Sequence, residues 1–261
     1  MEIPDILPMK RPLSIRTVDF SPLLKILSLG PHPDDFDAIG VTMRFFIDNG
    51  NRIHVGVLRT SSGVEDSYLS PATPEMKAAL RDEEQRRSCR FFGLPEECLT
   101  FIDLEQDEEA QPTDTPNNLN RLRDFIGFLE PDFVFLPHGN DTNNGHRVTY
   151  AMFRRIADDA DYPMAAFLNK DPKTIHMRID CYTAFAEEEA LWKRQMLRFH
   201  DSQHQRNLHT RNQGFDERIL SMDKQTAQEL GVDQPYAEAF EIERYGPEVE
   251  THHPESPLDP R

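Results

Sequence analysis

Short apolar runs alternate with amphipathic segments along the first half of the chain. The apolar runs cover residues 25–29, 53–58, 99–104 and 133–136, which is the length of buried strands. Strands that alternate with helices in this way predict a parallel sheet covered on both faces, so we expect an α/β fold. The segments with helical periodicity between these runs are residues 39–47, 75–92 and 119–129.

The pattern changes after Ile156. Residues 175–185 and 235–244 are expected to be extended, and residues 187–206 and 215–230 are expected to be helical. We interpret this half as a subdomain that caps the sheet and shapes a substrate pocket.

The composition excludes several classes of partner. The 261 residues carry 46 acidic and 29 basic side chains, for a formal charge of −17. Because phosphate binding needs clustered Lys and Arg, we expect no nucleic-acid partner and no attraction to an anionic membrane. No apolar run approaches the roughly 20 residues that span a bilayer, and residues 1–16 lack the apolar core of a secretory signal. The three cysteines have no CxxC spacing, so we expect a cytoplasmic protein with reduced thiols.

Two clusters of chemically active residues follow the first and fourth apolar runs. Residues 31–35 read PHPDD, and residues 137–146 read PHGNDTNNGH. Because parallel strands end at one edge of a sheet, we expect both clusters on the same rim. Imidazole and carboxylate oxygen are good Zn²⁺ ligands, so His32, Asp35 and His146 are candidates for a three-ligand site with open positions. Residues 31–35 alone also suit a simple strand-to-helix turn, in which Asp34 or Asp35 caps the helix.

The first cluster resembles the signature of the PIG-L/LmbE-like zinc deacetylases, which remove acetyl groups from N-acetylglucosamine conjugates. Further segments resemble that family's motifs in the same order, so the resemblance runs from about residue 25 to residue 240. It implies an LmbE-like, Rossmann-like three-layer sandwich with a mostly parallel sheet and a C-terminal capping subdomain. These segments are RDEE at 81–84, FGL at 92–94, DTNNGH at 141–146, HDSQ at 200–203 and YAEAF at 236–240.

On this basis we expect four regions along the chain. A core for metal binding is followed by the subdomain that forms the substrate pocket. The regions are an N-terminal extension (1–24), the Rossmann-like core (25–165), the C-terminal subdomain (166–245) and a disordered tail (246–261).

The resemblance also implies the chemistry. His32, Asp35 and His146 would bind Zn²⁺, and Asp34 would be the general base that activates water for attack on the acetamide carbonyl. Two histidines and one carboxylate also suit Fe²⁺ or another divalent metal. The implied partner is a small acetylated sugar conjugate, and relatives often form homo-oligomers.

Arg81 and Asp141 are expected to contact the substrate on the same basis. The residues around Arg81 also suit a different interpretation, in which it belongs to a solvated helix held by ion pairs. Asp37 stands near the position of a family glutamate, and it either takes over that role or marks a shifted helix start.

One departure from the family affects catalysis. The family has a histidine at position 143, where this chain has Asn143. An asparagine can donate a hydrogen bond but cannot deliver a proton at neutral pH. We therefore hypothesise that His138, on the same rim, supplies that proton.

These observations favour a zinc-dependent N-deacetylase of an amino sugar conjugate. A related zinc amidase that cleaves a different amide remains an alternative. Asn143 favours a second alternative, a carbohydrate-binding member of the family that has lost turnover.

Overall fold

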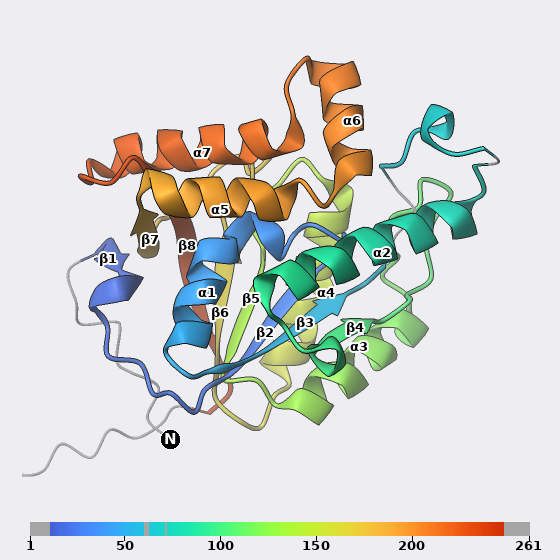
Figure 1. Ribbon diagram of the computed structural model, residues 1–261. Helices are drawn as coiled ribbons and strands as arrows, with labels where there is room; N and C mark the ends of the chain where they lie inside the picture. Colours follow the sequence, from blue (N-terminus) through green and yellow to red (C-terminus); the bar gives the residue numbers. More distant parts are fainter. Residues whose placement is uncertain (1–10, 60–62, 71, 248–261) are drawn as a thin grey trace, which may run out of the picture.

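One sheet of eight strands organises the chain (Figure 1). The structure is a computed structural model, which describes residues 11–59, 63–70 and 72–247. The strand order is β1-β7-β8-β6-β5-β2-β3-β4; β2 to β6 run parallel, and β8 is antiparallel to both β6 and β7. The strands are β1 (Leu13–Ser14), β2 (Lys25–Gly30), β3 (Arg52–Val57), β4 (Leu99–Phe101), β5 (Phe133–Pro137), β6 (Met164–Asn169), β7 (Cys181–Phe185) and β8 (Tyr236–Tyr245).

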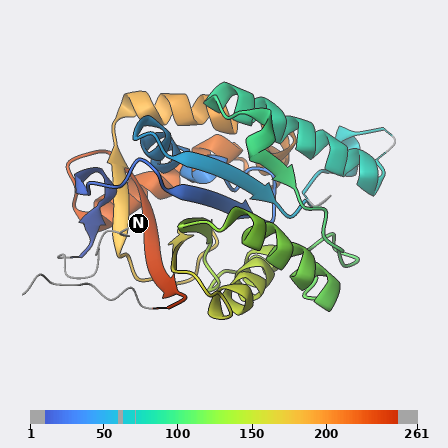
Figure 2. The same cartoon turned by 90° about the horizontal axis from the view of Figure 1, so that it is seen from below.

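Helices cover both faces of this sheet, as Figures 1 and 2 show. One face carries α1 (Gly40–Asp48), α2 (Pro74–Phe92) and α5 (Glu187–Leu197), and the other carries α3 (Pro116–Leu129) and α4 (Asn144–Asp158). The helices α6 (Asp201–Arg211) and α7 (Phe215–Leu230) follow α5 along one end of the molecule, and α7 packs on β8 and α5.

The central strands bury side chains on both faces, which explains why their sequences are continuously apolar. On β5, Phe133 and Phe135 enter the core under α1, whereas Val134 and Leu136 enter the core under α3 and α4. The expected mostly parallel three-layer α/β sandwich is therefore confirmed.

The strands and helices predicted between residues 25 and 136 are all present, although β4 is shorter than expected. β1, α4 and β6 were not predicted. Of residues 175–185, only Cys181–Phe185 form a strand. The prediction of one helix over residues 187–206 is wrong: α5 and α6 are separate helices. The chain turns at His200, with φ −87° and ψ 61°, and this turn places the His200 imidazole Nε2 3.1 Å from Oδ2 of Asp37.

The division into regions stays a prediction, although the sheet bears on it. The expected boundary between residues 165 and 166 lies inside β6, and β7 and β8 extend the same sheet. In the N-terminal extension, β1 pairs with β7 at the sheet edge. Most of the expected tail, residues 248–261, lies outside the described residues. None of the described helices combines the length and apolar composition needed to cross a bilayer.

Candidate metal centre

The two sequence clusters meet because β2 and β5 are parallel neighbours. The loop after β2 supplies His32 and Asp35, and the start of α4 supplies His146. The Asp35 carboxylate lies between the rings: Oδ2 is 3.4 Å from Nδ1 of His32, and Oδ1 is 3.4 Å from Nε2 of His146. One potential ligand atom from each residue lies within 4.8 Å of the others. The structure therefore brings together the three residues expected to bind the metal.

Gly30 at the end of β2 makes this approach possible. A Cβ on residue 30 would lie 2.6 Å from Cβ of Asp35 and 2.8 Å from its Oδ2. The same carboxylate oxygen accepts a hydrogen bond from the backbone N–H of His32 at 2.8 Å. Any larger residue at this position would push Asp35 away from the two histidines.

His146 is oriented by the residues just before it. Asn143 caps α4 by accepting a hydrogen bond from the N–H of Gly145 at 3.0 Å. Oδ2 of Asp141 lies 3.1 Å from Nδ1 of His146, while Oδ1 of Asp141 accepts from the N–H of Asn143 at 2.6 Å. The ring therefore presents its other nitrogen, Nε2, to Asp35, as in metal-bound histidines that a carboxylate supports.

The electrostatics of the centre favour a cation there. Burial lowers the pKa of His146, but its hydrogen bonds with Asp141 and Asp35 outweigh this and raise that pKa to about 10. Burial also opposes ionisation of Asp35, yet the two histidines hold its pKa well below the usual range. In the metal-free protein, the protonated imidazole of His146 thus lies between the carboxylates of Asp35 and Asp141. A divalent cation that bound this ring would displace its proton.

Asp34 stands beside these residues in a strained backbone conformation. Its φ of 128° lies in a region that residues other than glycine rarely adopt. Its N–H donates to Oε1 of Gln85 at 2.9 Å, and Nη2 of Arg81 donates to its carboxylate at 2.7 Å and also to the carbonyl of Pro33. Burial raises the pKa of Asp34, and the Arg81 guanidinium opposes this. Because Arg81 is only 2% exposed, its interpretation as a solvated helix residue is wrong.

Sequence reasoning named Asp37 as one candidate for a supporting role but missed the buried polar group that surrounds it behind Asp34. Gln85 donates from Nε2 to Asp37 at 2.9 Å, and Asp37 also accepts from Ser88 and faces His200. Asp37 is fully buried and lies away from the point where the three candidate ligands meet. Its role is to support Gln85. The available signal was the spacing of Arg81, Gln85 and Ser88, which puts three polar side chains on one face of α2.

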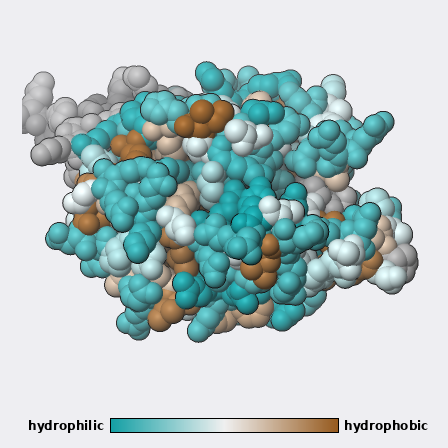
Figure 3. Space-filling view, turned by 90° about the horizontal axis from the view of Figure 1, so that it is seen from above, coloured by the Kyte–Doolittle hydropathy of each residue, from teal (hydrophilic) through white to brown (hydrophobic). Residues whose placement is uncertain are grey.

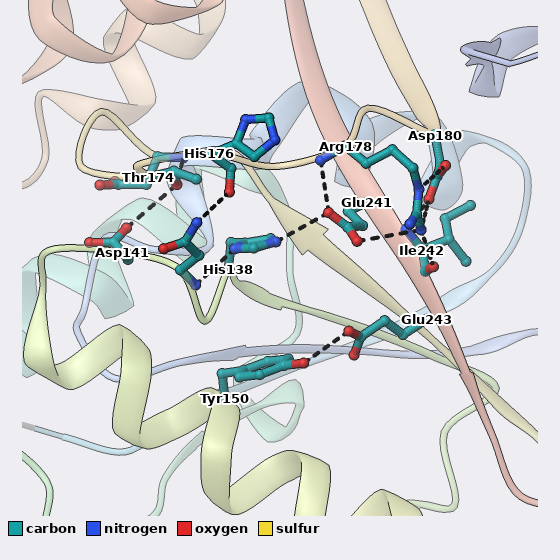
Figure 4. Close-up of polar contacts among 12 residues, drawn as sticks. His138, Asp141, Tyr150, Thr174, His176, Arg178, Asp180, Glu241, Ile242 and Glu243 are labelled. Carbon is teal, nitrogen blue, oxygen red and sulfur yellow. Dashed lines mark hydrogen bonds and ion pairs between the residues drawn. The ribbon is translucent and has the colours of Figure 1, made fainter.

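Two predicted site residues point elsewhere. The ring of His138 has Nε2 3.3 Å from Oε2 of Glu241 and accepts at Nδ1 from the N–H of Asn140 (Figure 4). The Asp141 carboxylate is buried behind His146 and lies 3.5 Å from the Thr174 hydroxyl. Neither residue is among those that line the cavity over the candidate ligands.

That cavity has a volume of about 480 Å³ and lies over His32, Asp35 and His146. Asp34, Arg81 and Asn143 also line it. The surface is largely hydrophilic on the face seen in Figure 3. Basic side chains are frequent in the lining: Lys77, Lys173, Arg206, Arg211 and Arg218.

The donor set fits Zn²⁺ or a similar divalent cation. Two imidazoles and one carboxylate match the ligands of catalytic zinc sites, which leave a position for water or substrate. Among the described residues, Asp141, His146 and Asp171 form a second group with ligand atoms within 4.8 Å. That group shares His146, whose Nδ1 already contacts Asp141.

Comparisons with known proteins place this chain in a family. The family model described as "PIG-L: GlcNAc-PI de-N-acetylase" matches residues 27–157. The chain belongs to the PIG-L family. This family model describes a de-N-acetylase, so the expectation of a hydrolytic N-deacetylase is supported. No curated protein sequence matches the chain significantly.

Solved structures share the fold at low sequence identity. An N,N'-diacetylchitobiose deacetylase from Pyrococcus horikoshii is 18% identical over 84% of this chain and 83% of its own, with a TM-score of 0.68. The zinc inhibited form of teicoplanin deacetylase Orf2 is 15% identical over 84% of this chain and 98% of its own, with a TM-score of 0.61. GalB, the 4-carboxy-2-hydroxymuconate hydratase from Pseudomonas putida KT2440, is 18% identical over 87% and 98%, with a TM-score of 0.58. Because a hydratase shares this fold, the reaction must be argued from the site.

Proposed function

We propose that the protein is a metal-dependent hydrolase that removes the acetyl group from a small N-acetylated amino sugar conjugate. The observation that carries the proposal is the meeting of His32, Asp35 and His146 beside Asp34, at the floor of one cavity. The PIG-L family model supports it, as do the similar folds of deacetylases that act on chitobiose and teicoplanin.

In this proposal His32, Asp35 and His146 hold Zn²⁺ or another divalent metal. When bound, such a metal supplies Lewis-acid polarisation of the amide carbonyl and makes water a stronger acid. Asp141 fixes the orientation of His146 from behind.

Asp34 is the proposed general base. Its carboxylate lines the cavity, and the Arg81 guanidinium orients it at 2.7 Å. Arg81 also favours the ionised carboxylate against the effect of burial, so that Asp34 can accept a proton from the attacking water.

The leaving nitrogen needs a proton, and Asp34 is the best-placed group to return it. The side-chain amide of Asn143 cannot deliver this proton. When Asn143 caps α4, however, it uses only its side-chain oxygen. Its N–H₂ group is therefore suited to donate a hydrogen bond to the developing oxyanion. The hypothesis that His138 delivers the proton stays untested. The contacts of His138 with Glu241 and Asn140 argue against it, and we assign the proton to Asp34.

The test combines metal content with acetate release from N-acetylglucosamine conjugates. We expect the purified protein to contain zinc and to release acetate. The Asp34→Asn variant should retain the metal and lose about 10²–10⁴-fold in turnover, the range for a general acid–base group. Asp114→Asn is the matched control, because Asp114 lies outside the cavity lining and forms its ion pair, within the described part of the chain, with Arg155.

Other outcomes would contradict the proposal in distinct ways. Bound zinc without acetate release favours cleavage of another amide or a carbohydrate-binding protein, the alternative that Asn143 supports. Full turnover in Asp34→Asn would remove this residue from the mechanism.

A further inference from the structure

We propose that the wall of the cavity formed by α6 and α7 binds a carboxylate or phosphate group carried by the substrate. This inference rests on the proposed function and names the class of conjugate: the part of the substrate remote from the acetamide is anionic. Three arginines form this wall, which we call the arginine wall: Arg206 and Arg211 on α6 and Arg218 on α7.

The guanidinium groups of the arginine wall have few protein partners among the described residues. Among the residues that the structure describes, neither Arg206 nor Arg218 has a hydrogen-bond or ion-pair partner for its guanidinium group. Arg211 donates only to the hydroxyl of its neighbour Thr210, at 3.1 Å. The chain has 17 more acidic than basic residues, so partners for these arginines were abundant. Their gathering in one cavity with so few partners therefore points to an external anion.

The cations also lie close to one another. Nη1 of Arg206 and Nη1 of Arg81 are 3.1 Å and 3.2 Å from the point where a Cβ on Gly63 would stand. Burial and the charges of Arg81 and Arg211 lower the pKa of Arg206, and burial and Arg211 lower that of Arg218. Arg206 and Arg211 are exposed and Arg218 is half-buried, so water screens part of their repulsion. Like charges gathered in one cavity still repel one another, and a bound anion attracts all of them.

The acidic residues of the cavity do not neutralise this wall. Asp35 belongs to the candidate metal centre, and Asp34 is paired with Arg81. Asp171 is the acid with the largest influence on Arg218, but its Oδ1 accepts from the N–H of Lys173 at 2.9 Å. The remaining acids in the lining, Glu108 and Glu109, are exposed residues of the loop between β4 and α3.

The position of the wall decides which end of the substrate it would meet. The acetamide must lie at the candidate metal ligands, which come from the loop after β2 and the start of α4. The arginines line the same cavity from α6 and α7, so they would contact the aglycone. Guanidinium groups suit this role because they bind carboxylate and phosphate oxygens in pairs.

The experiment compares three α-glycosides of N-acetylglucosamine: the neutral methyl glycoside, the carboxymethyl glycoside and the 1-phosphate. Acetate release is measured for the wild type, for the Arg206→Gln/Arg218→Gln double variant and for Arg154→Gln. Arg154 lies on α4, is exposed and is absent from the cavity lining, so it controls for the loss of a positive charge.

We expect the wild type to prefer one anionic glycoside over the neutral one by at least about tenfold in kcat/KM. The double variant should lose about 10–100-fold toward that substrate, mostly in KM, with little change toward the methyl glycoside, as expected for charge-assisted hydrogen bonds. Arg154→Gln should behave as the wild type. The preferred anion distinguishes a carboxylate from a phosphate. Arg206→Lys/Arg218→Lys should keep part of the preference, because the positive charge remains.

Binding of the same glycosides, measured by calorimetry, separates this inference from the proposed function. If none releases acetate but an anionic one binds more tightly, and the double variant removes that advantage, the wall is supported while the deacetylase proposal fails. Equal binding of the neutral and anionic glycosides to the wild type would overturn the inference. An unchanged preference in a folded double variant would overturn it as well.

Discussion

The imidazole of His146 illustrates how single residues determine metal binding in this centre. It is 3% exposed and contacts a carboxylate through each nitrogen. Because its pKa is about 10 without metal, it carries a proton at neutral pH that a metal ion must displace.

We therefore expect Zn²⁺ binding at pH 7 to release about one proton from His146. Asp141→Asn should lower the zinc affinity about 10–100-fold, the range for loss of a carboxylate behind a ligating histidine. It should also reduce proton release, because the pKa of His146 falls when a hydrogen-bonded carboxylate is lost. Calorimetry in buffers of different ionisation enthalpy measures both quantities, and Asp114→Asn is the control.

The same pKa fixes the sign of a pH effect on the metal-free protein. A folded pKa of about 10 against an unfolded value near 6.5 means that the native state binds the proton more tightly. This contribution to stability is fully present below about pH 6.5 and is lost as the pH rises toward 10. A metal-free wild type whose unfolding free energy does not fall over that window, relative to Asp141→Asn, would contradict this account.

At the scale of elements, the sequence predicted the strands and helices that have a clear local pattern. The first strands and helices carry clear periodicity and end signals, and parallel strand ends brought His32 and Asp35 to the same rim as His146. β6 was missed although its first five residues, 164–168, are as continuously apolar as the strands that were predicted. A short apolar run of this kind, with two alanines and few β-branched residues, suits a buried helix segment equally well.

The errors arise where tertiary contacts override local sequence. Residues 187–206 contain no Gly or Pro to mark the turn at His200, which is instead associated with the contact between His200 and Asp37. The orientations of His138 and Asp141 depend on a turn geometry that sequence position does not specify. The arginine wall requires α6 and α7 to meet over the centre, which spacing along the chain cannot show.

The end of β2 offers a test of how an element positions the site. In Gly30→Ala the new Cβ would meet Asp35 at 2.6 Å, so the carboxylate must move away from the histidines. We expect at least about a tenfold loss of zinc affinity, comparable with the loss of a supporting residue. Zinc competition with a chelator measures it.

Gly127→Ala is the matched control for that substitution. A Cβ on Gly127, within α3, would have nothing within 4 Å. Alanine there should raise stability by about 0.5–1 kcal/mol and leave zinc binding unchanged. Equal zinc affinity in both variants would show that Gly30 does not control the position of Asp35.

At the scale of the whole molecule, a buried ion cluster within residues 166–245 is linked to residues 25–165 through hydrogen bonds to Glu238. Nζ of Lys193 on α5 lies 2.6 Å from Asp223 on α7 and 2.8 Å from Glu238 on β8. Glu238 in turn accepts from the N–H and the hydroxyl of Thr42 on α1. All three charged side chains are essentially fully buried. Separating the two regions would remove the hydrogen bonds of Thr42 from the buried Glu238 carboxylate, which is costly.

We therefore expect residues 25–165 and 166–245 to unfold together. The single tryptophan, Trp192 on α5, packs against the rings of Phe91 and Phe92 on α2 and lies 4.8 Å beneath the guanidinium of Arg44 on α1. Its fluorescence therefore reports the contact between the two regions, whereas far-UV circular dichroism reports the whole chain. The two signals should give one coincident transition in urea.

Lys193→Met should lower the unfolding free energy by about 3–5 kcal/mol and shift both signals equally, because two buried carboxylates lose their partner. Separate transitions, or a shift of fluorescence alone, would show instead that the two regions are independent folding units.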